Sequence, residues 1–177
     1  MFLFLDRDGV INKRIVGDYV RNLSQCEWQP QAAEAIALLS QYFERILVIT
    51  NQQGVGKGYF SMENVAEIHA FIAAEIADKG GKIAAFYVCP HLKTDNCDCR
   101  KPQIGMALQA KKDFPEIDFS QSVMVGDSLS DMEFGRNAGM KTVFIATDGE
   151  KESPLIDEMY ENLWEFAEDI SRRVEQI

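Results

Sequence analysis

Short apolar runs alternate with segments of helical periodicity along the chain. Five apolar runs have the length and composition of buried strands: residues 2–5, 45–50, 83–88, 122–126 and 141–146. Apolar residues recur at helical spacing in four segments between them: residues 30–43, 62–79, 104–114 and 129–138. This alternation predicts an α/β fold, a doubly wound parallel sheet with helices on both faces.

Polar side chains follow three of the predicted strands directly. They are Asp6, Asp8, Thr50, Asn51, Asp127 and Asp131. Ligands of doubly wound sheets bind outside the carboxyl ends of the strands, near a topological switch point. We therefore expect these six side chains to gather at one edge of the sheet.

Several carboxylates at one edge would repel each other unless a hard cation lies among them. Mg²⁺ is the natural candidate, because it binds one or two protein carboxylates and accepts phosphate oxygens. Thr50 and Asn51 add neutral donors and Lys101 adds a positive charge, which together could hold a phosphate. Taken alone, Asp-x-Asp-Gly is as typical of a surface turn or a calcium loop as it is of a functional site. An EF-hand is excluded, because Gly9 stands at the fourth position of the motif and Val10 at the fifth.

A glycine-rich segment, residues 54–58, follows the second predicted strand. It lacks the first glycine of a Walker A loop, and no Ser or Thr follows Lys57. Two interpretations stay open: a turn before a helix capped near Ser61, or a loop that faces the substrate.

Four sequence features now carry a family resemblance: Asp6-x-Asp8-Gly9-Val10, Thr50-Asn51, Lys101, and Gly126-Asp127-x-x-x-Asp131. In order and spacing they resemble the four motifs of the haloacid dehalogenase superfamily of phosphohydrolases. The resemblance implies a Rossmann-like fold and phosphoryl transfer in two steps, with Asp6 as nucleophile and Asp8 as general acid and base. It also implies Mg²⁺ held by the carboxylates of Asp6 and Asp127 and the backbone carbonyl of Asp8, with Asp131 orienting the metal site.

Three cysteines and one histidine fall within eleven residues as C-x-H-x5-C-x-C: Cys89, His91, Cys97 and Cys99. Three thiolates and an imidazole suit a closed tetrahedral Zn²⁺ site, which favours a structural role for loop 89–99. A redox thiol cluster and coincidence are the alternatives. His69 and Cys26 are interpreted as an ordinary helix residue and a small hydrophobic residue.

Arg100-Lys101-Pro102 follows the cysteine and histidine cluster directly. The whole segment resembles a zinc-bearing subgroup of the superfamily, the D,D-heptose 1,7-bisphosphate phosphatases and the histidinol-phosphate phosphatases. The resemblance implies that Arg100 binds substrate and that Lys101 contacts the transferring phosphate. Ser128 departs from the pattern, since many members carry a basic residue there.

The substrate is expected to be a small phosphorylated metabolite, because the chain leaves no room for a large cap domain. Loops 12–29, 52–60 and 89–99 would border the site, with four cations as candidate contacts for a second anionic group: Lys13, Arg14, Lys57 and Arg100. The segments at 8–12, 18–20 and 51–58 resemble those of the heptose enzymes, which implies D-glycero-D-manno-heptose 1,7-bisphosphate 7-phosphatase activity. The short gap between His91 and Cys97 resembles that of the histidinol-phosphate enzymes, so a histidinol-phosphate phosphatase is the alternative. A zinc-stabilised binding module without catalysis is a third interpretation.

The chain has 177 residues and a formal charge of −10, with 46% hydrophobic residues. This composition excludes disorder, and the length predicts a single domain over residues 1–177, which the resemblance implies is a phosphatase domain. Residues 148–177 carry ten acidic and three basic residues, so seven of the ten net charges lie there, and we expect a helical tail over 153–177. The overall charge disfavours nucleic acid and membranes as partners. The first apolar run is too short for a signal peptide, so we expect a soluble, cytoplasmic protein. We also expect a monomer.

Overall fold

A computed structural model describes residues 1–146 and 152–176. Among these residues, one sheet holds six parallel strands in the order β3-β2-β1-β4-β5-β6. The strands are β1 Phe2–Leu5, β2 Arg45–Asn51, β3 Ala85–Cys89, β4 Val123–Gly126, β5 Lys141–Ile145 and β6 Glu158–Tyr160. The chain runs outward from β1 to β3 and then returns to β4 on the other side of β1. The topological switch point therefore lies between β1 and β4, where ligands of doubly wound sheets bind.

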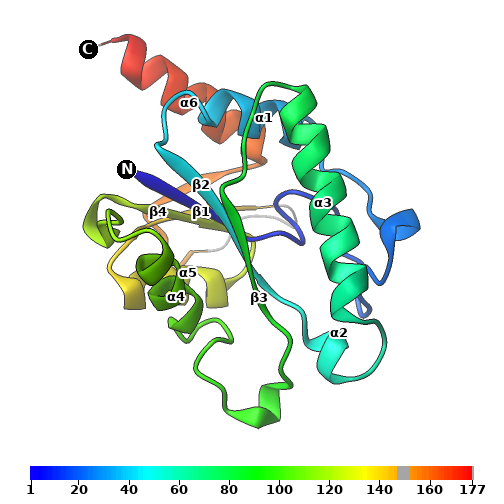
Figure 1. Cartoon of the computed structure of the whole chain (residues 1–177). Coiled ribbons are helices and arrows are strands. Elements are labelled where there is room, and N and C mark those ends of the chain that lie inside the picture. The colour runs from blue at the N-terminus through cyan, green and yellow to red at the C-terminus, as the bar shows by residue number, and fades with distance from the viewer. Residues whose placement is uncertain (147–151, 177) are drawn as a thin grey trace.

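Helices cover both faces of the sheet (Figure 1). They are α1 Ala32–Leu39, α2 Gln53–Gly56, α3 Met62–Asp78, α4 Gly105–Asp113, α5 Leu129–Ala138 and α6 Leu163–Glu175. Short 3₁₀ turns lie at Leu23–Gln25, Lys93–Asp95 and Phe119–Gln121. The apolar faces of α1, α3 and α6 pack into one buried cluster, and those of α4 and α5 pack into a second cluster across the sheet. The expected α/β architecture with helices on both faces is confirmed.

Strand β1 shows how the sequence selects this arrangement. Leu3 and Leu5 belong to the cluster beneath α1 and α3, whereas Phe2 and Phe4 belong to the cluster beneath α4. Successive side chains of a strand point to opposite faces, so a strand that is apolar at every position must be covered on both. Asp6 and Asp8, which follow β1, therefore lie at the carboxyl end of an inner strand of the sheet.

Helix α3 begins where its capping residue predicts. The Ser61 hydroxyl accepts a hydrogen bond from the Asn64 backbone, and the Asn64 side chain accepts one from the Ser61 backbone, which makes a reciprocal capping box. This confirms the helix expected to be capped near Ser61. Residues 54–56, predicted as part of a loop, instead form most of the one-turn helix α2.

The C-terminal region differs from the helical tail predicted over 153–177. Within the described part of that range, Glu158–Tyr160 forms β6 and pairs with β5, and helix α6 begins only at Leu163. The apolar residues at 155–159 happened to match a helical spacing, but the backbone there completes an edge of the sheet. Residues 147–151 and 177 lie outside the described residues. No helix in the described part of the chain is long and apolar enough to cross a membrane.

Candidate active site

Three carboxylates meet at the switch point of the sheet. Asp6 follows β1, Asp127 follows β4, and Asp131 lies in the first turn of α5. One oxygen of each lies within 4.8 Å of the others, and all three residues are buried. The prediction that these side chains gather at the carboxyl edge of the sheet is therefore confirmed for this set.

Lys101 reaches the same cluster from the far end of loop 89–99. Its Nζ lies 2.7 Å from Asp6 Oδ1 and 2.7 Å from Asp131 Oδ1, and donates to the Ile49 carbonyl at 2.8 Å. The side chain is 2% exposed. Burial opposes its charge, but the two carboxylates outweigh this and raise the pKa of Lys101, so the residue stays cationic.

The remaining negative charge in the cluster is the reason to expect a cation. Burial, together with the neighbouring Asp131, raises the pKa of Asp6 to about 6. Burial and the charges of Asp6 and Asp131 raise the pKa of Asp127 to about 8. Three carboxylates share the buried Lys101 and the half-exposed Arg14, which pairs with Asp127, so a divalent ion would relieve the remaining repulsion. A set of oxygen ligands open towards a cavity fits Mg²⁺, which retains waters and accepts phosphate oxygens.

Two glycines let the cluster pack this closely. A Cβ atom on Gly9 would lie 1.9 Å from Asp127 Oδ2, and the Gly9 backbone has φ +95°. A Cβ atom on Gly126 would lie 2.2 Å from the Cβ of Asp131. Both positions therefore need glycine because another side chain of the site fills the space.

Asp8 lies beside the cluster but has different partners. Its carboxylate accepts hydrogen bonds from Arg7, from Asn12 Nδ2 at 2.8 Å and from Gln52 Nε2 at 2.8 Å. Burial alone would raise the pKa of Asp8, but the Arg7 charge and these hydrogen bonds hold it below its usual value. Sequence reasoning missed Arg7, Asn12 and Gln52, all of which adjoin recognised motifs.

The two residues of the second motif, Thr50 and Asn51, have distinct positions. Asn51 accepts from the Lys101 backbone N–H at 3.0 Å and donates to the Lys101 carbonyl at 3.2 Å, so it fixes the segment that carries the lysine. The Thr50 hydroxyl is almost fully buried and accepts from Gln52 at 2.8 Å.

Ser128, the residue that departs from the family pattern, is the N-cap of α5 and donates to Asp131 Oδ2 at 2.7 Å. It therefore positions a carboxylate of the cluster.

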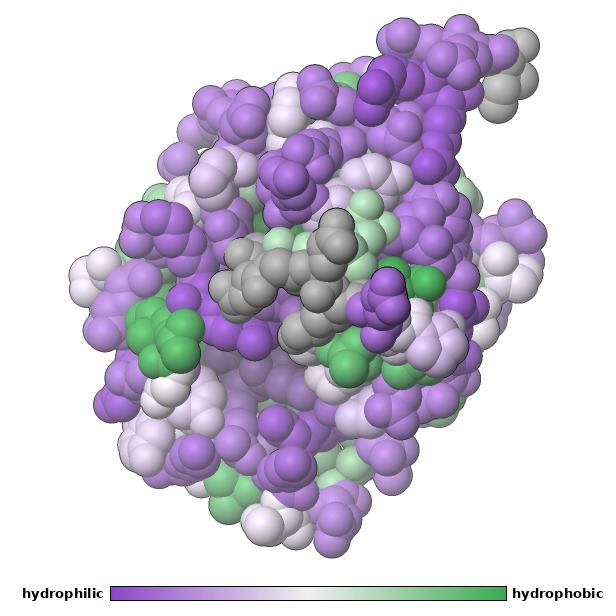
Figure 2. Space-filling model, turned by 180° about the vertical axis from the view of Figure 1, so that it is seen from behind, coloured by the Kyte–Doolittle hydropathy of each residue, from purple (hydrophilic) through white to green (hydrophobic). Residues whose placement is uncertain are grey.

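A cavity of about 670 Å³ opens from these residues towards solvent. Its outer wall carries cations, three of them among the predicted contacts for a second anionic group: Arg14, Lys57 and Arg100. Lys13, the fourth, instead pairs with Glu27, and Arg21 is a wall cation that the sequence analysis did not identify. Arg14 Nη2 also lies 2.7 Å from Asp127 Oδ1. Figure 2 shows a hollow with a hydrophilic lining on one face of the molecule, as a site for a small phosphorylated ligand requires.

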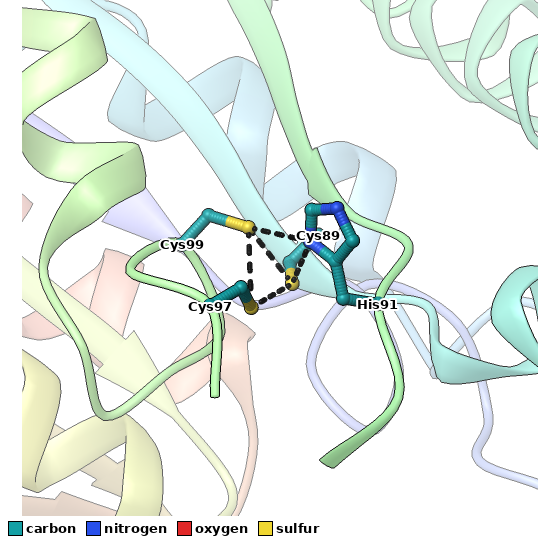
Figure 3. Close-up of side chains that lie close together, drawn as sticks. All are labelled: Cys89, His91, Cys97 and Cys99. Atoms are coloured by element: carbon teal, nitrogen blue, oxygen red, sulfur yellow. Dashed lines mark hydrogen bonds between the residues drawn. The ribbon is translucent and has the colours of Figure 1, made fainter. Parts of the chain in front are cut away.

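The predicted zinc ligands lie close together at the end of β3 (Figure 3). The sulfur of Cys89 lies 3.5 Å from that of Cys97 and 3.0 Å from that of Cys99, and His91 Nδ1 lies 3.1 Å from Cys99 Sγ. None of these cysteines forms a disulfide. Zn–S bonds of about 2.3 Å in a tetrahedron separate the sulfurs by about 3.8 Å, so a small adjustment of this cluster fits zinc.

The cysteine and histidine loop is hydrogen-bonded to the glycine-rich segment. The Gly56 N–H donates to the Pro90 carbonyl at 2.9 Å, and Gln53 Oε1 accepts from the Lys93 N–H at 2.7 Å. A Cβ atom on Gly56 would meet the Pro90 oxygen at 2.7 Å, so glycine allows the two loops to approach. Residues 54–58 thus pack against the cysteine and histidine loop through Gly56, while Lys57 lines the cavity.

Comparison with known proteins agrees with this geometry. The family model described as HAD-hydrolase-like matches residues 98–171. The chain is 44% identical over 168 residues to D-glycero-alpha-D-manno-heptose-1,7-bisphosphate 7-phosphatase of Mycobacterium bovis, covering 93% of this chain and 88% of that protein. It is 39% identical to D-glycero-beta-D-manno-heptose-1,7-bisphosphate 7-phosphatase of Pseudomonas aeruginosa, covering 82% and 80% of the two chains.

A solved structure extends the likeness to three dimensions. The D,D-heptose 1,7-bisphosphate phosphatase from B. bronchiseptica, complexed with magnesium and phosphate, superposes with a TM-score of 0.86 at 29% identity, covering 97% of this chain and 98% of that one. The resemblance inferred from the four motifs and the cysteine loop is thus confirmed. The chain belongs to the heptose-1,7-bisphosphate 7-phosphatase family of haloacid dehalogenase-like hydrolases.

Proposed function

We propose that the protein is a magnesium-dependent phosphatase that removes the 7-phosphate of D-glycero-D-manno-heptose 1,7-bisphosphate. The observation that carries this proposal is the cluster of Asp6, Asp127, Asp131 and Lys101 at the base of a cation-walled cavity. Relatives at 44% and 39% identity bear the name of this activity. A bisphosphate suits a cavity with one cationic site at its base and further cations along its wall.

In the proposed reaction, Asp8 takes up a proton when the negatively charged phosphate enters the site. Asp6 then attacks the phosphorus of the 7-phosphate while Asp8 gives this proton to the departing sugar oxygen. A water molecule, whose proton passes to Asp8, then attacks the phosphorus of the aspartyl-phosphate; the bond from phosphorus to Asp6 breaks, which releases inorganic phosphate and restores the Asp6 carboxylate. Lys101 stays between Asp6 and Asp131, and its positive charge stabilises the phosphate that is bound beside them. Mg²⁺, bound by the Asp6 and Asp127 carboxylates and the Asp8 carbonyl, would offset the negative charge of the phosphoryl group.

Asn51 and Arg100 have supporting roles in this proposal. Asn51 fixes the backbone of Lys101, and Arg100 lines the cavity next to it. The buried Thr50 hydroxyl accepts a hydrogen bond from Gln52, which also donates to Asp8, so Thr50 would support the site through Gln52. Asp131, paired with Lys101 and Ser128, orients the metal site without needing to bind the ion.

We also propose a structural Zn²⁺ at Cys89, His91, Cys97 and Cys99. Four protein ligands close a tetrahedral site, which leaves no open position for chemistry. The loop would then hold Arg100 and Lys101 at a fixed distance from the carboxylates. Free thiols of this kind suit the reducing cytoplasm, where we expect the enzyme to act as a monomer.

The distinguishing experiment compares kcat/KM for heptose 1,7-bisphosphate with kcat/KM for histidinol phosphate. The proposal predicts a strong preference for the heptose substrate, because only that substrate places a second phosphate against Arg14, Lys57 and Arg100. A preference for histidinol phosphate would overturn the substrate assignment but retain the phosphatase chemistry. Absence of turnover on either substrate and on other sugar phosphates would favour a binding module.

The anomer of the substrate can be proposed from the relatives. Those at 44% identity act, by name, on the alpha anomer, and the one at 39% on the beta anomer. We therefore propose the alpha anomer as the better substrate. Phosphate release from the separately prepared anomers tests this, and a higher kcat/KM for the beta anomer would contradict it.

A further inference from the structure

Arg7 lies in sequence between the two aspartates of the first motif, and its side chain is completely buried. Its Nη2 lies 2.9 Å from Asp8 Oδ1 and 3.1 Å from Asp8 Oδ2, and its Nε lies 3.3 Å from Asp8 Oδ1. A buried guanidinium is costly unless its charge and its N–H groups are satisfied. Asp8 satisfies one side of the group, so the other side needs an acceptor.

His69, on helix α3, supplies that acceptor. Arg7 Nη1 lies 3.3 Å from His69 Nε2. Because a guanidinium only donates, Nε2 must accept, and the imidazole must be neutral with its proton on Nδ1. The residue is 7% exposed, and its ring stacks on Phe86, with centroids 4.3 Å apart and planes 15° apart. His69 is therefore held in one place by the helix and by the ring beneath it.

The arrangement fixes both oxygens of Asp8. Oδ1 accepts from Arg7 and from Asn12 Nδ2, and Oδ2 accepts from Arg7 and from Gln52 Nε2. The Asp8 side chain is still 24% exposed, and the residue lines the cavity. The Asp8 carboxylate, which must exchange protons with substrate and water, is thus held by Arg7, Asn12 and Gln52 while part of it stays accessible from the cavity.

We propose that His69 is a positioning residue that acts through Arg7 to hold Asp8 in line with the leaving oxygen of the substrate. The inference rests on the proposed function, in which the Asp8 proton moves to the sugar oxygen as the P–O bond breaks. Asp8 then takes a proton from the water that attacks phosphorus. Without the His69 acceptor, Arg7 Nη1 has no side-chain partner among the described residues, and the guanidinium is free to shift together with Asp8.

The choice of leaving group separates this role from a general structural one. An alkoxide leaving from a sugar phosphate needs the Asp8 proton, whereas 4-nitrophenolate or acetate leaves without one. General acid catalysis contributes about 10²–10⁴-fold where it is needed. The measurement is the ratio of kcat/KM for heptose 1,7-bisphosphate to kcat/KM for 4-nitrophenyl phosphate or acetyl phosphate. This ratio does not depend on the fraction of protein that is folded.

The variants are His69→Leu, which removes the acceptor, and His69→Gln, whose amide oxygen can replace it. Asp8→Asn sets the lower limit of the ratio. We expect His69→Leu to lower the ratio about tenfold through kcat, with KM for the heptose substrate nearly unchanged, and His69→Gln to restore most of it. If His69→Leu does not fold, His69→Met provides the same test, since a thioether is only a weak acceptor.

Thr142→Val is the matched control. Thr142 is also fully buried, and its hydroxyl bonds to the Leu155 carbonyl at 2.6 Å, away from the cavity. This variant should lose stability and keep the wild-type ratio. An unchanged ratio in His69→Leu, or equal losses with both kinds of leaving group, would overturn the positioning role. A wild-type protein without turnover on any phosphate would instead overturn the proposed function.

Discussion

Replacing Lys101 with methionine removes the positive charge that lies between Asp6 and Asp131. Each Nζ–oxygen contact is 2.7 Å long. At an effective dielectric constant of about 20, such a contact corresponds to about 6 kcal/mol of gross Coulomb energy. The cost of burying these charged groups offsets much of this energy while the lysine is present. After the lysine is removed, the carboxylates stay buried without its charge, so that cost is no longer offset. Loss of one partner of a buried pair typically costs about 3–5 kcal/mol.

We therefore expect Lys101→Met to lower the free energy of unfolding by about 3–5 kcal/mol near neutral pH. Urea unfolding without added magnesium, and with zinc left in place, measures this loss. Addition of magnesium should stabilise the variant more than the wild type, because magnesium then replaces the positive charge that the carboxylate cluster has lost.

Lys79→Met is the matched control, because Lys79 pairs with Glu34 at 2.8 Å while both side chains are nearly half exposed. An exposed pair contributes at most about 1 kcal/mol. A loss for Lys101→Met no larger than that of the control would refute the electrostatic reasoning about the cluster.

Three further predictions concern the metal sites and the backbone. Cys97→Ser should reduce bound zinc well below one ion per chain and lower the melting temperature, since a structural zinc contributes folding energy; a wild type that is equally stable without zinc would contradict this. Without magnesium, the unfolding free energy should fall as pH rises from about 4 to about 8. The reason is that the folded protein raises the pKa of Asp6 to about 6 and the pKa of Asp127 to about 8, so their protonated forms favour folding. A stability that rises over this range, or a fall that magnesium does not reduce, would oppose this prediction. Gly9→Ala should abolish activity, because the added Cβ atom meets Asp127. Gly139→Ala is the control: its backbone has φ +86° with open space around it, so this variant should only lose stability. Equal activity in the two variants would show that the close approach of Gly9 to Asp127 is unimportant.

The sheet could be predicted because its signal is local. β1 is apolar at every position and is followed at once by charge, which only a strand buried on both faces explains. β6 could not be predicted, because its three residues carry little pattern and are a strand only through pairing with β5. Tertiary contact decides such short edges.

The candidate site divides in the same way. Asp6, Asp127 and Lys101 stand in recognisable motifs, so their meeting at the switch point was predictable. His69 carries no such signal, since a histidine on the inner face of α3 is read as an ordinary helix residue. Its contact with Arg7 joins residues 62 positions apart. Lys13 shows the converse, because the charge could be read from the sequence but its pairing with Glu27 could not.

The central claim is that Asp6 is the nucleophile of a magnesium-dependent heptose bisphosphate phosphatase. The most direct test measures phosphate released from D-glycero-D-manno-heptose 1,7-bisphosphate by the wild type and by Asp6→Asn, with and without magnesium. The account predicts release by the wild type with magnesium, with one phosphate per substrate molecule, and no release above background by Asp6→Asn. Turnover that survives Asp6→Asn, or wild-type turnover that does not depend on magnesium, would contradict it.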